Sequence, residues 1–177
     1  FFQAMLALIQ YQSSAEALQQ IVFWSMGSLT RANWAANGVL AAVLIIALPI
    51  LWALGWRLTA LRLGDARATA MGINTSRLRV VVLIVVSLVA ATTVAFAGII
   101  GFIGLVGPHI ARMLVGEDQR YFLPASMAAG AAVMCAAHAV SLMIKPGLAI
   151  PIGIVTSLLG VPFFIAIVMT RRRALWT

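Results

Sequence analysis

Charged residues are scarce in this sequence. Only 9% of its 177 residues are Asp, Glu, Lys or Arg and 63% are apolar, whereas soluble domains average about 25% charged residues. The chain has a single cysteine, Cys135, which excludes an internal disulfide and any metal site built from several cysteines. These shortages exclude an ordinary soluble domain and indicate an integral membrane protein.

Several motifs of catalysis and energy conversion are also missing. The sequence has no Gly-x-x-x-x-Gly-Lys-Ser/Thr loop, and its only lysine is Lys145, so this chain lacks the residues that hold the phosphates of ATP. No Asp or Glu lies inside an uncharged run, whereas ion-coupled carriers usually keep a carboxylate within the membrane. Protease and hydrolase motifs are absent too. We therefore expect neither enzyme activity nor a bound cofactor or metal in this chain. If the protein transports a substrate against a gradient, a partner must supply the energy.

Long uncharged runs mark the membrane spans. A span needs about 20 apolar residues, and three runs hold one span each: 39–56, 121–144 and 146–170. The run 80–111 has 32 residues, which we interpret as a full span to about Ala97, a Gly-rich turn and a shorter returning helix opened by Pro108. Residues 1–15 resemble the end of a further span. The sequence thus predicts an all-α integral membrane protein with about five to six transmembrane helices in one domain, 1–177.

The positive charges give the expected orientation. The chain has 12 Lys and Arg against 4 Asp and Glu, placed between apolar blocks and not in a patch with aromatics, so we expect contact with membrane lipid and no nucleic acid. Ten of the twelve fall on one side of the predicted spans, which the positive-inside rule makes cytoplasmic. These are Arg57, Arg62, Arg67, Arg77, Arg79, Arg112, Arg120, Arg171, Arg172 and Arg173. Only Arg31 and Lys145 fall on the other side.

Two segments outside the spans have helical patterns. In the outer stretch 12–34, apolar residues recur at helical spacing and predict a short amphipathic helix at the membrane surface. In the cytoplasmic loop 57–79 we expect a short helix from Asp65 to Met71, which Gly72 ends in the left-handed conformation. Its small apolar face, with a basic residue beside it, consists of Ala66, Ala70, Met71 and Arg67. The loop is either a solvated connector or an element that docks into a soluble partner.

Small residues gather in two later segments. Glycines occur at every third position over 98–107, a spacing that allows close backbone approach. Gly153, Ser157 and Gly160 form one small-residue face, where the hydroxyls of Thr156 and Ser157 either bond to backbone carbonyls or face a polar passage. His109 and His138 are interpreted as structural residues, with a pathway-lining role as the alternative.

Four motifs in this order carry a family resemblance. They are residues 23–29 (Phe-Trp-Ser-Met-Gly-Ser-Leu), 63–74 (from Leu-Gly-Asp to Gly-Ile-Asn), 101–112 (Gly-Phe-Ile-Gly-Leu-Val-Gly-Pro-His-Ile-Ala-Arg) and 151–164 (from Pro-Ile-Gly to Pro-Phe-Phe). They resemble the permease subunits of bacterial ABC importers for iron-siderophores, haem and vitamin B12. The resemblance is to the C-terminal half of that family and covers essentially the whole chain. Met71 stands where the family more often has Leu.

The resemblance implies a fold and a set of partners. Permeases of this family have ten helices and work as pairs, with two ATPase subunits below and a periplasmic substrate-binding protein above, in the cell inner membrane. This chain is then a fragment that lacks the N-terminal half. A homodimer and a heterodimer of permeases both remain open, and so does the substrate among ferric siderophores, haem and cobalamin, with ferric siderophores the commonest case in the family.

The same resemblance implies which residues form the functional sites. The expected ATPase-coupling loop lies within 57–79 and consists of Gly64, Asp65, Arg67, Ala70, Met71 and Gly72. The expected translocation path is bordered by Gly153, Thr156, Ser157 and Gly160. Arg31 and Lys145 are the candidates for docking the binding protein. Two other classes remain as alternatives: a secondary carrier or channel not coupled to ATP, and a purely structural membrane subunit.

Overall fold

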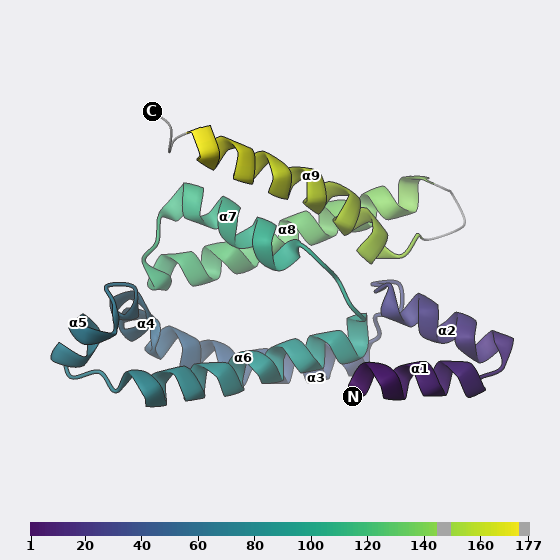
Figure 1. Cartoon of the computed structure of the whole chain (residues 1–177), viewed down its shortest axis with the longest axis horizontal. Coiled ribbons are helices and arrows are strands. Elements are labelled where there is room, and N and C mark those ends of the chain that lie inside the picture. The colour runs from purple at the N-terminus through teal and green to yellow at the C-terminus, as the bar shows by residue number, and fades with distance from the viewer. Residues whose placement is uncertain (145–149, 174–177) are drawn as a thin grey trace.

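The protein is all-helical in the residues that the computed structural model describes, 1–144 and 150–173 (Figure 1). The helices are α1 (Phe2–Gln12), α2 (Ala15–Ser25), α3 (Trp34–Ala53), α4 (Gly55–Leu61), α5 (Asp65–Ala70), α6 (Thr75–Ala97), α7 (Ile103–Val115), α8 (Gln119–Ile144) and α9 (Ile152–Arg173). Lys145 lies outside the described residues.

The helices form two groups (Figure 1). In one group α3 and α6 run in opposite directions and contact each other, and in the other α7 and α8 form a closely packed hairpin against which α9 lies. The short helices α4 and α5 lie at one end of the molecule, while α1 and α2 lie at the opposite end. This arrangement places the loop after α3 and the turn between α7 and α8 at the same end, where α4 contacts α8.

The long helices match the predicted spans. Within the described residues, α3, α6 and α8 are long and apolar enough to cross a membrane. The apolar stretches Ile103–Val115 and Ile152–Ile167 are shorter. None of the apolar window of α6 is buried within this chain, so its side chains are available to lipid or to further helices. The predicted class, an all-α integral membrane protein, is confirmed.

Polar caps and glycines set the ends of these helices. The side chain of Asn33 accepts a hydrogen bond from the Ala36 N–H (2.8 Å) at the start of α3, and Asn74 does the same for Arg77 (2.9 Å) at the start of α6. α6 ends at Gly98, whose φ is +75°, a conformation that glycine adopts without steric cost. The end of this span at Ala97 therefore agrees with the prediction.

The returning helix begins earlier than predicted. We expected Pro108 to open it, but α7 starts at Ile103 and Pro108 lies inside the helix. The reason is packing: Gly107, just before the proline, is buried against α8, where a Cβ atom would lie 3.0 Å from the Cα of Gly130. Helical backbone is thus needed before Pro108, and the contact offsets the hydrogen bond that the proline cannot donate.

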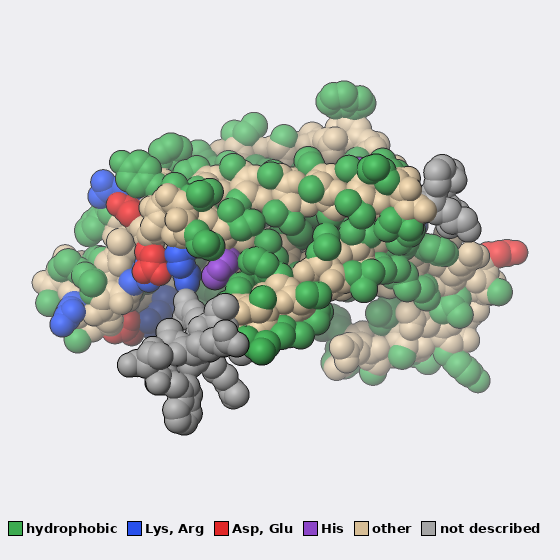
Figure 2. All heavy atoms as spheres, turned by 90° about the horizontal axis from the view of Figure 1, so that it is seen from above, with side chains coloured by type: hydrophobic (Ala, Val, Ile, Leu, Met, Phe, Trp, Pro, Cys, Tyr) green, Lys and Arg blue, Asp and Glu red, His purple; other side chains and the backbone are tan. Residues whose placement is uncertain are grey.

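Charges and apolar side chains occupy different parts of the surface. Hydrophobic side chains cover most of the face seen in Figure 2, whereas charged ones gather mainly at the end that carries α4 and α5. Beneath this charged end lies a small core made by α4, α5 and the start of α6. A second core joins α8 to α9. Each core is small because most apolar residues face outward, as expected of a chain solvated by lipid.

Candidate functional site

The segment 57–79, predicted as a loop, forms most of α4, all of α5, the connection after α5 and the first five residues of α6. Two glycines with positive φ bound α5: Gly64 (+97°) precedes it and Gly72 (+80°) follows it. The predicted glycine stop is confirmed, although the helix ends at Ala70, one residue before Met71. Inside the segment, Asp65 pairs with Arg79 at 2.6 Å across the connection. The sequence thus forms a short helix whose two ends are set by glycines.

α5 buries one side and leaves the other open. Ala68 is fully buried in the core beneath the charged end, where it packs with Ala60 of α4 and with Ile73 and Leu78. The predicted apolar face is exposed instead: Ala66, Ala70 and Met71 all lie at the surface, as does Arg67. Burial of Ala68 holds the helix, so its opposite side is presented in a fixed orientation.

A groove lies beside the exposed face of α5. Its volume is about 530 Å³, and its walls come from the start of α4, the connection after α5 and the first turns of α6. Met71 and Asn74 line it together with Trp56, Arg57 and Arg77. Because the walls combine an aromatic ring, a thioether and two guanidinium groups, the groove can accept an apolar segment that carries negative charge.

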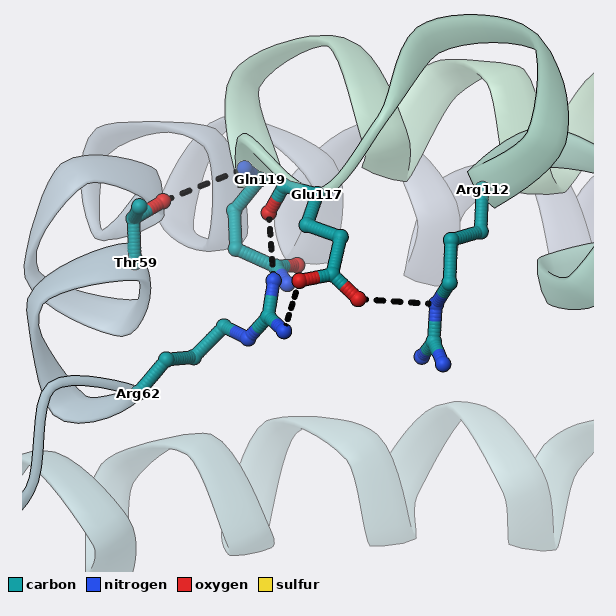
Figure 3. A network of polar contacts seen from close by, with 5 residues as sticks. All are labelled: Thr59, Arg62, Arg112, Glu117 and Gln119. Carbon is teal, nitrogen blue, oxygen red and sulfur yellow. Dashed lines mark hydrogen bonds and ion pairs between the residues drawn. The ribbon is translucent and has the colours of Figure 1, made fainter. Parts of the chain in front are cut away.

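A polar network links α4 to the turn between α7 and α8 (Figure 3). The carboxylate of Glu117, in that turn, accepts a hydrogen bond from Arg62 at the end of α4 and pairs with Arg112 of α7 at 3.4 Å. Arg62 also donates to the backbone carbonyl of Glu117 at 3.2 Å. At the start of α8, the Gln119 N–H donates to the hydroxyl of Thr59 at 3.1 Å. These contacts join segments about 55–60 residues apart in the chain.

The opposite end of the molecule is joined by backbone hydrogen bonds. The loop after α2 donates from the Ser28 N–H to the Ala97 carbonyl at the end of α6 (2.9 Å). The same loop accepts from two N–H groups at the start of α9: Ile152 donates to the Gly27 carbonyl (3.1 Å) and Gly153 to the Met26 carbonyl (3.0 Å). The loop therefore satisfies terminal groups of two helices that have no partner within the helix. We call residues 26–28, with these two helix ends, the outer junction.

The small-residue face of α9 is partly occupied within the chain. Gly153 packs on the Met26 carbonyl and Gly160 on the ring of Phe102, and neither position has room for a Cβ atom. Thr156 is 3% exposed, and its hydroxyl donates to the Gly153 carbonyl at 3.2 Å. Ser157 instead lines an apolar groove beside α2 and α9. Of the two predicted path residues with a hydroxyl group, Ser157 lines this open groove, whereas Thr156 lines a smaller apolar cavity between α7, α8 and α9.

The remaining predicted residues are dispersed. Arg31 lies exposed between α2 and α3, at the end that carries the outer junction. Lys145, the other docking candidate, lies outside the described residues. The His109 ring contacts the Phe163 ring edge-on at 5.6 Å between centroids, and His138 is half-buried in α8. In the described part of the chain, His, Cys, Asp and Glu side chains form no group of three or more that could hold a metal ion.

Sequence reasoning missed Glu117 and the outer junction. Glu117 is one of only four acidic residues and stands in a turn between two predicted spans. Its rarity beside several Arg residues was the sequence feature that could have indicated an ion pair there. The junction had a weaker signal, the glycines at 27 and 98, because its bonds use backbone atoms that any residue carries.

The fold is that of a multi-pass membrane protein. A profile of the FecCD transport family matches residues 1–170. The chain belongs to the FecCD transport family.

Named relatives agree with this assignment. The chain is 40% identical to the Fe(3+)-citrate import system permease protein YfmE of Bacillus subtilis, over 86% of this chain and 46% of that protein. It is 36% identical to the hemin transport system permease protein HmuU of Yersinia pestis, over 96% of this chain and 51% of that protein. Relatives whose names refer to molybdate and to cobalamin match as well. The chain spans about half the length of the curated relatives it matches.

A solved structure shares the fold. It is described as an inward-facing conformation of a metal-chelate type ABC transporter, and it superposes with a TM-score of 0.89 at 37% identity. The match covers 96% of this chain and 55% of that one. The resemblance to ABC importer permeases, drawn above from four motifs, is thereby confirmed.

Proposed function

We propose that this chain is the C-terminal half of a permease subunit of an ABC importer. The importer carries a ferric siderophore, or a related chelate such as haem or cobalamin, across the bacterial inner membrane, and ATP is hydrolysed on a separate subunit. Relatives named for Fe(3+)-citrate, hemin and cobalamin support this range of substrates, and one named for molybdate widens it.

The observation that carries the proposal is the presentation of α5. Burial of Ala68 holds the helix, while Ala70 and Met71 remain exposed beside a groove that contains Arg57 and Arg77. A fixed, exposed helix at a basic membrane boundary is suited to dock in a cleft of a soluble partner. We assign that partner as the ATPase and α5, with its flanking residues Gly64 and Gly72, as the coupling element.

The path and the partners at the opposite end follow from the same assignment. We propose that the face of α9 with Gly153, Thr156, Ser157 and Gly160 borders the passage where two permease subunits meet. The substrate-binding protein docks at the other membrane face, where Arg31 and Lys145 offer positive charge. The permease pair is either a homodimer or a heterodimer.

Uptake by cells tests the proposed function. Cells with and without the full-length gene are given labelled ferric citrate, ferric hydroxamate, haem, cobalamin and molybdate in turn. We expect gene-dependent uptake of one iron chelate or related compound, and its loss when the partner ATPase carries an inactivating substitution. Uptake that survives this substitution and collapses with the membrane potential would show a secondary carrier and overturn the proposal.

Binding kinetics test the docking residues. Arg31→Glu and Lys145→Glu each remove one surface ion pair, which is worth about 0.2–1 kcal/mol, so the association rate with the binding protein should fall by up to about fivefold at low salt. The deficit should shrink as ionic strength rises. An unchanged rate at low salt for either variant removes that residue from the docking surface.

A further inference from the structure

The contacts between α4 and the turn that links α7 to α8 form a joint between two parts of the molecule. One part is α4 with α5, the other is the α7–α8 hairpin, and the proposed function requires the two to move together. α4 presents one stripe to this turn, formed by Gly55, Thr59 and Arg62 at spacings of four and three, which lie on one helix face. At Gly55 a Cβ atom would lie 3.7 Å from the Cγ of Arg120. Thr59 and Arg62 add the polar contacts shown in Figure 3.

The other side of α4 is bound to the coupling element. Ala60 packs with Ala68 of α5 and with Leu78 of α6 in the core beneath the charged end. α4 is therefore held by apolar contacts to α5 and by polar contacts to the turn after α7. A displacement of α5 reaches the α7–α8 hairpin through α4, because packed interiors transmit a shift instead of absorbing it.

Glu117 is the centre of the polar side of this joint. Its carboxylate lies between the guanidinium groups of Arg62 and Arg112, one from each of the two parts, and its backbone carbonyl accepts from Arg62 as well. Side chains in this cluster are 41–46% exposed. Ion pairs this exposed contribute little to folding stability, so replacing Glu117 should leave the fold intact and change the connection.

We propose that Glu117 is a positioning residue for energy coupling: it holds α4 to the α7–α8 hairpin, so that movement of α5 on the ATPase is passed to the spanning helices. The inference rests on the proposed function. It assigns to Glu117 an effect on the amount of substrate imported for each ATP hydrolysed, separate from docking of the ATPase and from folding.

The test uses the full-length permease with its ATPase and binding protein in proteoliposomes. Import and ATP hydrolysis are measured in the same vesicles, with whichever of ferric citrate, ferric hydroxamate, haem or cobalamin the wild type imports. E117Q and R62Q should each lower the import per ATP by up to about fivefold at low salt, the upper limit for one exposed ion pair. The two losses should not multiply in the double variant, because both substitutions remove the Arg62–Glu117 ion pair, although E117Q also removes the pairing with Arg112 and R62Q the bond to the Glu117 carbonyl.

Asp118 supplies the matched control. It is the next residue and carries the same charge, and its carboxylate accepts a hydrogen bond from the Arg120 N–H at 3.0 Å, which Asn can also accept. D118N should keep the wild-type ratio. The difference in import per ATP between E117Q and D118N should shrink as ionic strength rises. Salt screens the Glu117 ion pairs, which D118N keeps, whereas E117Q has no such pairs to weaken.

Two results would overturn the inference. One is an import per ATP that is equal in E117Q and D118N at low salt. The other is loss of ATPase binding in E117Q, which would place the residue in assembly. Failure of the proposed function is recognised separately, because the wild type itself would then import none of the four compounds in an ATP-dependent way.

Discussion

Gly107 of α7 lies against Gly130 of α8 so closely that a Cβ atom on Gly107 would stand 3.0 Å from the Gly130 Cα and 3.2 Å from the Ser126 carbonyl oxygen. Two backbones thus meet where the hairpin is tightest. Close approach of this kind is how transmembrane helices gain packing in lipid, where burial of apolar surface gives no driving force.

Gly107→Ala should therefore destabilise the hairpin. The added methyl group meets backbone atoms that cannot rotate away, and overpacking of this kind costs about 1–3 kcal/mol. Gly104→Ala is the control on the same helix, since a Cβ atom there meets nothing within 4 Å. Thermal unfolding of the purified full-length protein in detergent should show a lower Tm for the first variant only. Equal Tm values would mean that the hairpin can open at no cost.

A second pair of glycines separates crowding from backbone strain. Gly98 and Gly116 have nearly the same φ, +75° and +77°. A Cβ atom on Gly98 would run into the Trp24 carbonyl and the Gly27 backbone, while one on Gly116 meets nothing within 4 Å. Gly116→Ala should cost about 1–2 kcal/mol from the left-handed conformation alone. Gly98→Ala should cost more and lower the folded yield, and similar losses in both would contradict the outer junction as described.

The exposed face of α5 predicts a loss of function without a loss of fold. Ala70→Trp places a large ring on the surface that docks with the ATPase, so ATP-driven uptake should be abolished while membrane insertion and Tm stay normal. Ala68→Trp is the contrast, because that side chain is fully buried and a ring there should disrupt folding, by about 1–3 kcal/mol or more. Normal uptake by the Ala70 variant would remove α5 from the docking surface.

Thiol labelling distinguishes two adjacent residues of α9. A cysteine at Ser157, which lines a groove, should react with a small water-soluble thiol reagent faster than one at Thr156, which is 3% exposed. Both are made in a Cys135→Ser background, since Cys135 is itself exposed. Protection of both positions in every nucleotide state would make this face of α9 a packing surface only.

Local features of this fold follow from the sequence. The stop at Gly72 and the end of α6 at Ala97 were predicted, because residue type and spacing act within a few residues. The caps at Asn33 and Asn74 are equally local but were not predicted. The uncharged runs predict the membrane spans, because a helix that crosses the lipid needs about 20 consecutive apolar residues.

Contacts between distant segments did not follow from the sequence. α3 and α6 are apolar on all sides, so periodicity does not show which face meets a neighbour. The Glu117 network and the Thr59–Gln119 bond join residues 55–60 positions apart, and any of several Arg residues was an equally good partner from the sequence. Pro108 was misplaced because its position depends on how Gly107 packs on α8.

The outer junction also has a mechanical consequence. It binds α6 and α9 to one short loop at one end, and α6 has 23 residues, a length of about 34 Å. Because the junction holds one end of α6, a tilt of α6 by about 5° about that end would move its other end, at Thr75, by about 3 Å. A small angular change at one membrane face becomes a displacement the size of an atomic contact at the other.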